Sequence, residues 1–120
     1  MKPEINKTKF GSITIAGEIY EHDVIIRLNG RVEKRKKKLS KEIFGTSHII
    51  SQTEAAYVYE DGARWIIIGT GQSGMAKLSD EADEFFQQKG CQVSLLPTPD
   101  AIRCWNETKE ASIGLFHVTC

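Results

Sequence analysis

The chain has 120 residues, of which 40% are hydrophobic and 27% are charged, a composition typical of globular domains and not of disordered or fibrous chains. Its 16 basic and 16 acidic residues balance, so no overall field attracts nucleic acid or an anionic membrane. The longest apolar runs, such as residues 65–68, are too short to cross a bilayer, and the N-terminus lacks the apolar stretch of a signal peptide.

The first third of the chain has the patterns of β structure. Apolar and polar residues alternate within Phe10–Ile15, and Val24–Leu28 is a mainly apolar run. Asn29-Gly30 then predicts a hairpin with a type I′ turn, because these two residues tolerate positive φ angles best. Arg31–Arg35 should return antiparallel to the preceding run, and residues 34–41 form a lysine-rich stretch without an assigned element.

The rest of the chain alternates helices with strands. Ser51-Gln52-Thr53-Glu54 is a capping box, in which the serine hydroxyl and the glutamate carboxylate each satisfy a free backbone amide. The helix that it begins should end at Asp61-Gly62. The later elements are a strand at 64–68, a helix capped by Ser79 and ended by Gly90, a strand at 92–96, a helix opened by Thr98-Pro99-Asp100 and a strand at 113–118.

This order of elements predicts an α/β domain. Strands joined by helices through short links are parallel, with right-handed crossovers. A β-hairpin unit followed by a β-α-β-α-β unit therefore gives a mixed sheet with helices packed against it. Because the sequence marks no linker or repeat, we expect a single domain over residues 1–120.

One glycine-rich motif follows the strand at 64–68. Gly69-Thr70-Gly71-Gln72-Ser73-Gly74 matches G-x-G-x-x-G, whose backbone amides approach a phosphate in dinucleotide-binding folds. The next helix begins several residues late, near Ser79, and the strand at 92–96 is not followed by an acid that would hold a ribose. We therefore expect no cofactor, and the alternative is a tight turn packed closely on its neighbours.

A ligand of an open α/β sheet binds beyond the carboxyl ends of the parallel strands. Here that edge is marked by two turns, Gly69-Thr70-Gly71 and Pro97-Thr98-Pro99. A loop histidine and a lysine of the basic stretch are expected to approach it. Backbone amides, helix N-termini and cations would then all favour a small anion. The expected ligand-binding residues are His48, Gly69, Thr70, Gly71, Thr98 and Lys37.

The basic residues of segment 31–41 suggest nucleic-acid binding as an alternative function. The segment contains no aromatic residue for base stacking, and a strand edge protected from aggregation by lysines explains the same composition. The neutral net charge also argues against a nucleic-acid partner.

Cysteine and histidine residues suggest a third possibility. Cys91, Cys104 and Cys120 fit no paired motif, so reduced thiols and a cytoplasmic location are expected. His117-x-x-Cys120 has no second pair at metal-ligand spacing, and we expect no metal site. An enzyme that uses Cys104 or His48 at the ligand edge stays open, although no residue is assigned as catalytic.

Several short motifs together resemble a known family along almost the whole chain. They are Phe10-Gly11-Ser12-Ile13, Asp23-Val24-Ile25, Gly45-Thr46-Ser47-His48, Ile66-Ile67-Ile68-Gly69-Thr70-Gly71, Leu96-Pro97-Thr98 with Ala101 and Asn106, and Phe116-His117-Val118-Thr119-Cys120. The chain resembles domain-of-unknown-function family four-nine-eight, which includes the adipogenesis-associated domain protein and the mitochondrial complex I assembly factor 3 type. The resemblance implies a three-layer α/β fold around a mixed sheet, and it implies no established reaction.

The leading interpretation is therefore a non-enzymatic binding or assembly domain. Its partner would be an unknown protein or a small anion at the expected edge. The ligand, the protein partner, the oligomeric state and the biological process are left open by the sequence.

Overall fold

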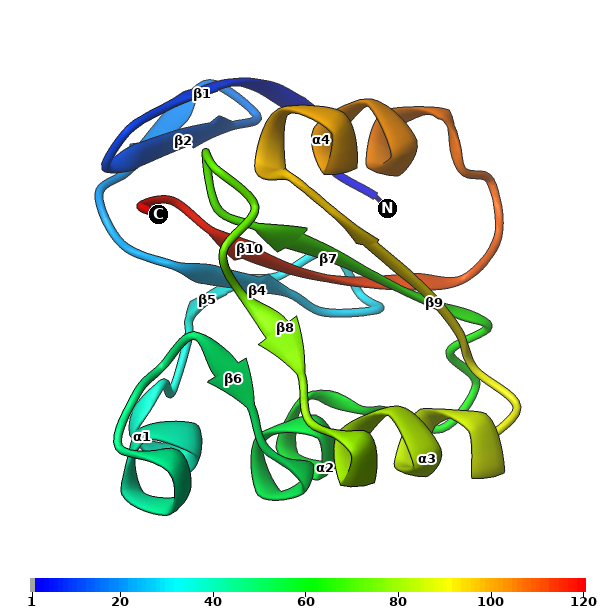
Figure 1. The fold of residues 1–120 in the computed structure, drawn as a ribbon. Coiled ribbons are helices and arrows are strands. Elements are labelled where there is room, and N and C mark those ends of the chain that lie inside the picture. The colour runs from blue at the N-terminus through cyan, green and yellow to red at the C-terminus, as the bar shows by residue number, and fades with distance from the viewer. Residues whose placement is uncertain (1) are drawn as a thin grey trace.

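A five-stranded sheet runs through the middle of the molecule in the computed structural model, which describes residues 2–120 (Figure 1). Its order is β5-β4-β10-β7-β9. The strands are β4 (Val24–Ile26), β5 (Val32–Lys34), β7 (Trp65–Thr70), β9 (Gln92–Leu96) and β10 (Ser112–His117). β7 is parallel to β9 and β10, whereas β4 is antiparallel to β10 and β5. The predicted mixed sheet is confirmed.

Helices alone cover one face of this sheet, whereas a helix and a second, smaller sheet cover the other (Figure 1). On one side lie α1 (Lys38–Phe44), α2 (Gln52–Val58) and α3 (Asp80–Gln88). On the other lie α4 (Thr98–Glu107) and a three-stranded antiparallel sheet of β1 (Ile5–Lys9), β2 (Ser12–Ile15) and β3 (Glu18–Tyr20). A short parallel pair, β6 (Ile49–Ile50) and β8 (Lys77–Leu78), precedes α2 and α3 along the chain. The three-layer α/β domain is confirmed.

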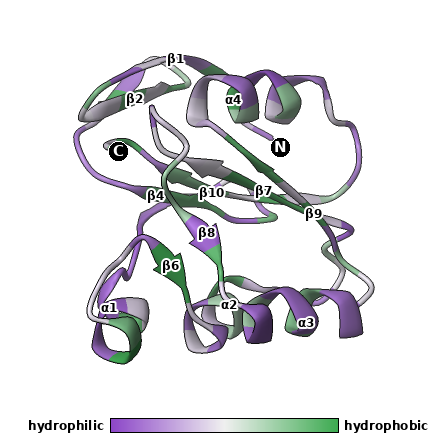
Figure 2. Cartoon of the chain, viewed as in Figure 1, coloured by the Kyte–Doolittle hydropathy of each residue, from purple (hydrophilic) through white to green (hydrophobic). Residues whose placement is uncertain are grey.

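The hydrophobic core lies on both faces of the central sheet, and β7 contributes to each. Ile66 and Ile68 pack with α2 and α3, whereas Ile67 packs with α4 and the three-stranded sheet. All three side chains are fully buried, as the continuous apolar run predicted. In Figure 2 the strands of the central sheet are largely hydrophobic, whereas the helices that cover them are largely hydrophilic with some hydrophobic residues. None of the helices within residues 2–120 is long and apolar enough to span a membrane.

The hairpin between β4 and β5 is confirmed, but its predicted type I′ turn is wrong. The Arg27 amide donates to the Arg31 carbonyl over 2.9 Å, and the Gly30 amide donates to the Arg27 carbonyl over 2.9 Å. Of the two turn residues only Gly30 has a positive φ, of 89°, whereas a type I′ turn requires two. In this longer loop the Asn29 side-chain oxygen accepts the Arg31 amide over 3.0 Å.

Two other predictions need correction around α1 and α2. The lysine-rich stretch, left without an element, contains the end of β5 and the first turn of α1. Ser51 caps α2 by accepting the Glu54 amide over 3.1 Å, as predicted, and the helix ends at Val58, before Asp61-Gly62. The Glu54 carboxylate does not return to the Ser51 amide, which donates to the Ser40 hydroxyl.

Glu54 is buried and binds Arg35, the first residue after β5. The Arg35 Nε donates to Glu54 Oε2 over 2.6 Å, and Nη2 donates to Oε1 over 2.9 Å. Both side chains are 0% exposed. Ser40 of α1 donates to the same carboxylate, and Arg35 also donates to the Ser47 carbonyl and to Asp23 Oδ2. This pair therefore ties β5, both helices and two loops together at one end of the sheet.

We expect Glu54→Gln to lower the free energy of unfolding by about 3–5 kcal/mol, because it leaves the Arg35 charge buried with only the partly exposed Asp23 to balance it. Chemical denaturation followed by circular dichroism measures the change. The control Glu84→Gln, at an exposed position of α3, should alter stability by no more than about 0.5 kcal/mol. Equal effects of the two substitutions would contradict the role assigned to the pair.

Candidate functional site

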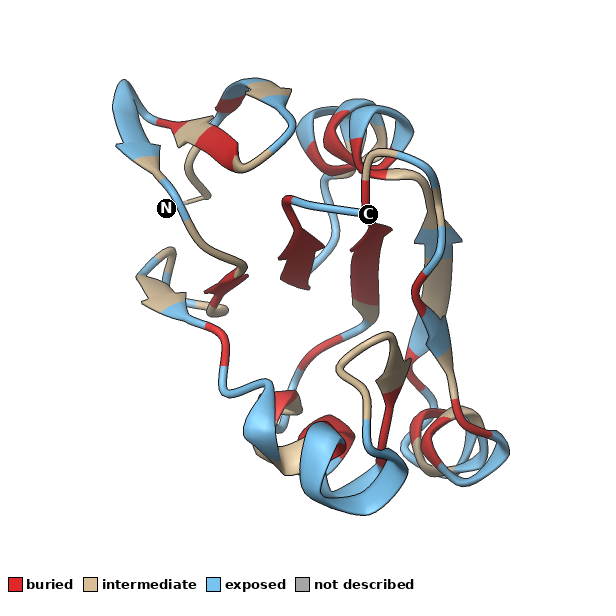
Figure 3. Cartoon of the chain, turned by 60° about the vertical axis from the view of Figure 1, so that its left-hand side comes forward, coloured by how far each residue is buried: buried red, intermediate tan, exposed pale blue. Residues whose placement is uncertain are grey.

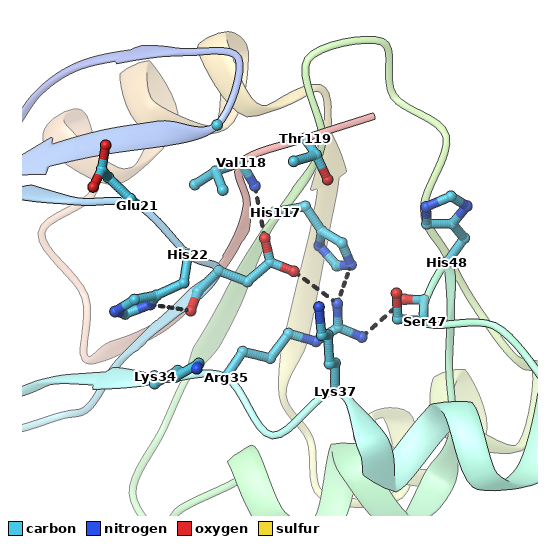
Figure 4. Close-up of a pocket in the computed structure, with 12 residues that line it drawn as sticks. Glu21, His22, Lys34, Arg35, Lys37, Ser47, His48, His117, Val118 and Thr119 are labelled. Atoms are coloured by element: carbon cyan, nitrogen blue, oxygen red, sulfur yellow. Dashed lines mark hydrogen bonds and ion pairs between the residues drawn. The ribbon is translucent and has the colours of Figure 1, made fainter.

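A pocket of about 250 Å³ opens at the carboxyl end of β10, next to the Arg35–Glu54 pair (Figure 4). It is smaller than the roughly 300–1,000 Å³ of sites for drug-sized ligands. Its basic and imidazole side chains come from the β3–β4 loop, the end of β5, the segment between β5 and α1, the loop before β6, and β10. They are His22, Lys34, Arg35, Lys37, His48 and His117.

His117 is the last residue of β10 and is only 3% exposed. Its Nδ1 lies 3.0 Å from the Gly69 carbonyl, and its Nε2 lies 2.7 Å from Arg35 Nη1. A carbonyl only accepts and a guanidinium only donates, so Nδ1 carries the proton and Nε2 is the acceptor. The ring is therefore neutral, and both nitrogens are occupied by protein groups. In this arrangement His117 cannot take a proton from a ligand.

The surroundings of His117 favour this neutral form. Burial lowers the pKa of His117, and the positive charge of Arg35 lowers it further, whereas the Asp23 carboxylate opposes both. Arg35 gives one Nη1 bond to Asp23, and the other Asp23 oxygen accepts the Val118 amide over 2.9 Å. The floor of the pocket is thus a saturated hydrogen-bond network and not a set of free polar groups.

The two turns expected to form the binding edge do lie side by side. The Thr98 amide donates to the Gly71 carbonyl over 2.9 Å, and the Gly71 amide donates to Thr98 Oγ1 over 2.9 Å. Thr98 Oγ1 in turn donates to the His117 carbonyl over 2.6 Å. The Gly69 carbonyl is bound to the imidazole, as described above. These residues therefore support His117 from behind and do not line the pocket.

Close packing explains the glycines at this position. A Cβ on Gly71 would lie 2.0 Å from the Cys120 carbonyl carbon, and one on Gly69 would lie 2.8 Å from the Phe116 ring. The amides of Gln72, Ser73 and Met75 donate to carbonyls of the C-terminal residues, and the amide of Ala76 donates to the Thr70 carbonyl. The tight, closely packed turn considered as an alternative matches this arrangement, and these amides are already bound within the protein.

The other two expected residues, Lys37 and His48, both line the pocket. Figure 4 shows Lys37 on the Arg35 side and His48 beside Ser47. Lys37 directly precedes α1, and His48 directly precedes β6, where its carbonyl accepts the Lys77 amide over 2.8 Å. The structure therefore separates the expected set into two pocket-lining residues and four supporting ones.

The residues on which the two alternative functions would depend are Cys104 and the basic segment 31–41. Cys104 is on α4, where its sulfur is 3.9 Å from Ser94 Oγ of β9, and it does not line the pocket with His48. Within the basic segment, Arg35 is buried and Lys36 Nζ lies 4.9 Å from the centroid of the Tyr57 ring. Arg35 therefore does not contribute to an exposed basic surface.

Sequence reasoning missed the residues that organise this site. Arg35 stood within a lysine run and was read as part of a solvated edge, and Glu54 was read as a capping residue. One signal was available: an arginine among lysines can bind a carboxylate through two parallel bonds, which a lysine cannot. The place of His117 at the end of a parallel strand was a second signal, because ligands gather at that edge.

Because folded His117 stays neutral, we expect the protein to lose stability as the pH falls below about 6.5, the pKa of an unfolded histidine. Below that value the unfolded chain binds a proton that the folded chain does not, down to the lowered pKa of His117. The contribution has a slope of at most about 1.4 kcal/mol per pH unit, and it vanishes above about pH 6.5. Denaturation of the native chain between pH 5 and 8 should show this slope, and His117→Gln should flatten it. A slope that His117→Gln leaves intact, or that the control His48→Gln removes, would refute this assignment.

Comparison with known proteins places the fold in a family. Residues 5–113 match the family described as protein of unknown function (DUF498/DUF598). The crystal structure of conserved hypothetical protein PH1505 from Pyrococcus horikoshii OT3 is 31% identical, with a TM-score of 0.91 over 98% of this chain and 99% of that one. The structure named MT938 is 30% identical, with a TM-score of 0.84 over 99% and 100% of the two chains.

A more distant solved structure shows the same fold. The solution structure of a Mth938-like domain from Bordetella pertussis is 15% identical, with a TM-score of 0.65 over 97% of this chain and 85% of that one. The family match spans most of the chain, and the two more similar structures share its full architecture, so the resemblance noted in the sequence is confirmed. The chain belongs to the DUF498/DUF598 family of Mth938-like domains.

Proposed function

We propose that this chain is a non-enzymatic binding domain that holds a small anion, such as a carboxylate or phosphate group, in the pocket at the carboxyl end of β10. The observation that carries the proposal is the pairing of charges around the pocket. Asp23 and Glu54 are bound to Arg35, whereas Lys34 and Lys37 have no ion-pair partner among residues 2–120. Two exposed ammonium groups thus face the pocket without a bound carboxylate.

The same geometry indicates which groups would contact the ligand. All five N–H groups of Arg35 have acceptors in the protein: two on Glu54 and one each on Asp23, Ser47 and His117. An anion would therefore be bound mainly by Lys34, Lys37 and the partly exposed His48. The glycine amides first expected to contribute are not free, so side-chain cations replace them in the proposal. The negative charge of Glu21 on the opposite rim limits the ligand to a compact group near the lysines (Figure 4).

The pocket is better suited to binding than to catalysis. Acid–base catalysis needs a group that exchanges a proton with the substrate, and both nitrogens of His117 are already bound to protein groups. A nucleophilic cysteine would have to lie beside a base, yet no cysteine lines this pocket within residues 2–120. These observations support binding as the function and leave the sequence-based enzyme alternative to a direct test.

Titration calorimetry with phosphate, sulfate, citrate and nucleotides tests the proposal. We expect at least one of these anions to bind, with a Kd that Lys37→Ala raises about ten-fold or more, since a hydrogen bond to a charged group contributes about 1.5–3 kcal/mol. His48→Ala should weaken the same ligand. Added salt should also weaken it, because the lysines are exposed.

A matched control is Lys109→Ala, which removes an exposed lysine after α4 and should leave the Kd unchanged. No heat with any of the four anions, for the native chain and variants alike, would refute an anion pocket. Binding only to single-stranded or duplex oligonucleotides, with a steep salt dependence, would instead favour the nucleic-acid alternative.

Thiol alkylation at neutral pH tests the enzyme alternative. We expect exposed Cys120 to react first and buried Cys91 last, because burial raises the pKa of the Cys91 thiol and less thiolate is present. Mass spectrometry of peptides after timed iodoacetamide treatment gives the order. A Cys104 that reacts much faster than Cys120 would be an activated thiol and would support a cysteine enzyme.

A further inference from the structure

Two hollows lie next to each other on the layer of α1, α2 and α3, and they share no lining residue with the pocket at the end of β10. The first, of about 250 Å³, is lined by the end of α1 and by the starts of α2 and α3. The second, of about 130 Å³, continues along α3. Gln52 and Glu81 line both hollows, which therefore form one groove, the α2–α3 groove. Figures 1 and 3 show the three helices together in one layer, with their outer sides largely exposed.

One stripe of α3 forms a wall of this groove. Its residues occupy positions i, i+3, i+4 and i+7, which lie on one side of an α-helix. They are Glu81, Glu84, Phe85 and Gln88. Seven steps of 1.5 Å give the stripe a length of about 10 Å, or about two helical turns. A second helix that lies along α3 would therefore match the stripe over about two turns.

The groove contains large apolar side chains that the rest of the protein does not cover. Ile43 is 55% exposed and Phe44 is 38% exposed, at the point where Gly45 ends α1. Phe85, which is half-buried, lines the second hollow. Exposed apolar groups that are rimmed by polar residues mark sites of protein association. An amphipathic helix repeats its apolar residues at i, i+3, i+4 and i+7, and this spacing matches that of the α3 stripe.

The charge of the groove identifies the kind of helix. Glu81 and Glu84 line the groove, and Asp80 and Asp83 belong to the same helix. None of these four acids has an ion-pair partner in the described part of the chain. No lysine, arginine or histidine of residues 2–120 lines either hollow. The helix dipole explains the acids of the first turn of α3, but Glu84 lies beyond that turn. A helix that docks here should therefore carry positive charge.

We propose that the α2–α3 groove binds a basic amphipathic helix of a partner protein. The partner helix lays its apolar side on Ile43, Phe44 and Phe85, and its lysines or arginines lie beside Glu81 and Glu84. A second copy of this chain does not offer such a helix, because each of its four helices already has one side buried within the chain. The contact spans about two turns, so the Kd should be about 10 µM or above.

Fluorescence anisotropy with a labelled peptide tests the proposal. The probe is a helix of about 14 residues, with leucines at i, i+3, i+4 and i+7 and lysines elsewhere. The native chain should bind it, and added salt should weaken the binding because the acids are exposed. The same peptide with glutamates in place of the lysines should not bind. In NMR titrations with the lysine peptide, the backbone amide signals of Gln52, Glu81 and Gln88 should shift.

Two substitutions separate the apolar from the electrostatic part of the contact. Ile43→Ser should raise the Kd about five-fold by removing apolar area. Glu84→Lys should raise it about ten-fold, because a lysine there repels the lysines of the peptide. Both residues are exposed, so the melting temperatures should stay close to native. The matched controls are Ile19→Ser on β3 and Glu107→Lys on α4, at exposed positions on the other face of the central sheet, and both should leave the Kd unchanged.

Four results would overturn the proposal. One is no binding by the native chain up to about 1 mM protein, and another is equal binding of the glutamate peptide. The third is a Kd that Ile43→Ser and Glu84→Lys leave unchanged, or that the two controls raise as much. The fourth is self-association of the native chain that Ile43→Ser removes, because the groove would then belong to a second copy.

Discussion

The buried ion pair between Arg35 and Glu54 connects parts of this fold that are distant in the sequence. It joins the segment after β5 to α2, and the Ser40 and Ser47 bonds add α1 and the loop before β6. Transfer of two charges from water is costly, so such a pair persists only where every donor and acceptor has a partner. Here each Arg35 N–H has one, and no buried side-chain polar atom within residues 2–120 lacks a partner.

This saturation has a consequence for function. By residue type alone, the buried polar residues Arg35, Glu54 and His117 resemble an active site. Their hydrogen bonds show that they satisfy each other. Arg35 and His117 form the floor of a small pocket, and Glu54 lies outside its lining. The groups left to meet a ligand are on the rim, which is why the proposal rests on Lys34, Lys37 and His48. The glycine-rich turn contributes indirectly, since Gly69 and Thr98 hold the imidazole and the backbone of His117 in place.

The pocket and the β9 edge lie at different parts of the central sheet. The pocket is at the carboxyl end of β10, and β9 is two strands away at the edge. Relatives with about 30% identity keep the architecture over their full length, with TM-scores of 0.91 and 0.84, so the layered fold tolerates extensive change of sequence.

The sequence by itself determined the elements whose signals are local. Alternation, capping residues and glycine stops identified the β4–β5 hairpin, α3 with its Ser79 cap and the strand β9, because propensity and hydrogen bonding act between residues near each other in the chain. The mixed sheet followed from their order, and the family from the combined motifs.

Tertiary structure alone decided the partners of the side chains. Whether Glu54 caps its own helix or binds Arg35, 19 residues earlier, depends on which charges are brought together and removed from water. Local sequence carries no record of that contact, and for the same reason only folding separated Lys37 and His48, which line the pocket, from Gly69, Thr70, Gly71 and Thr98, which support it.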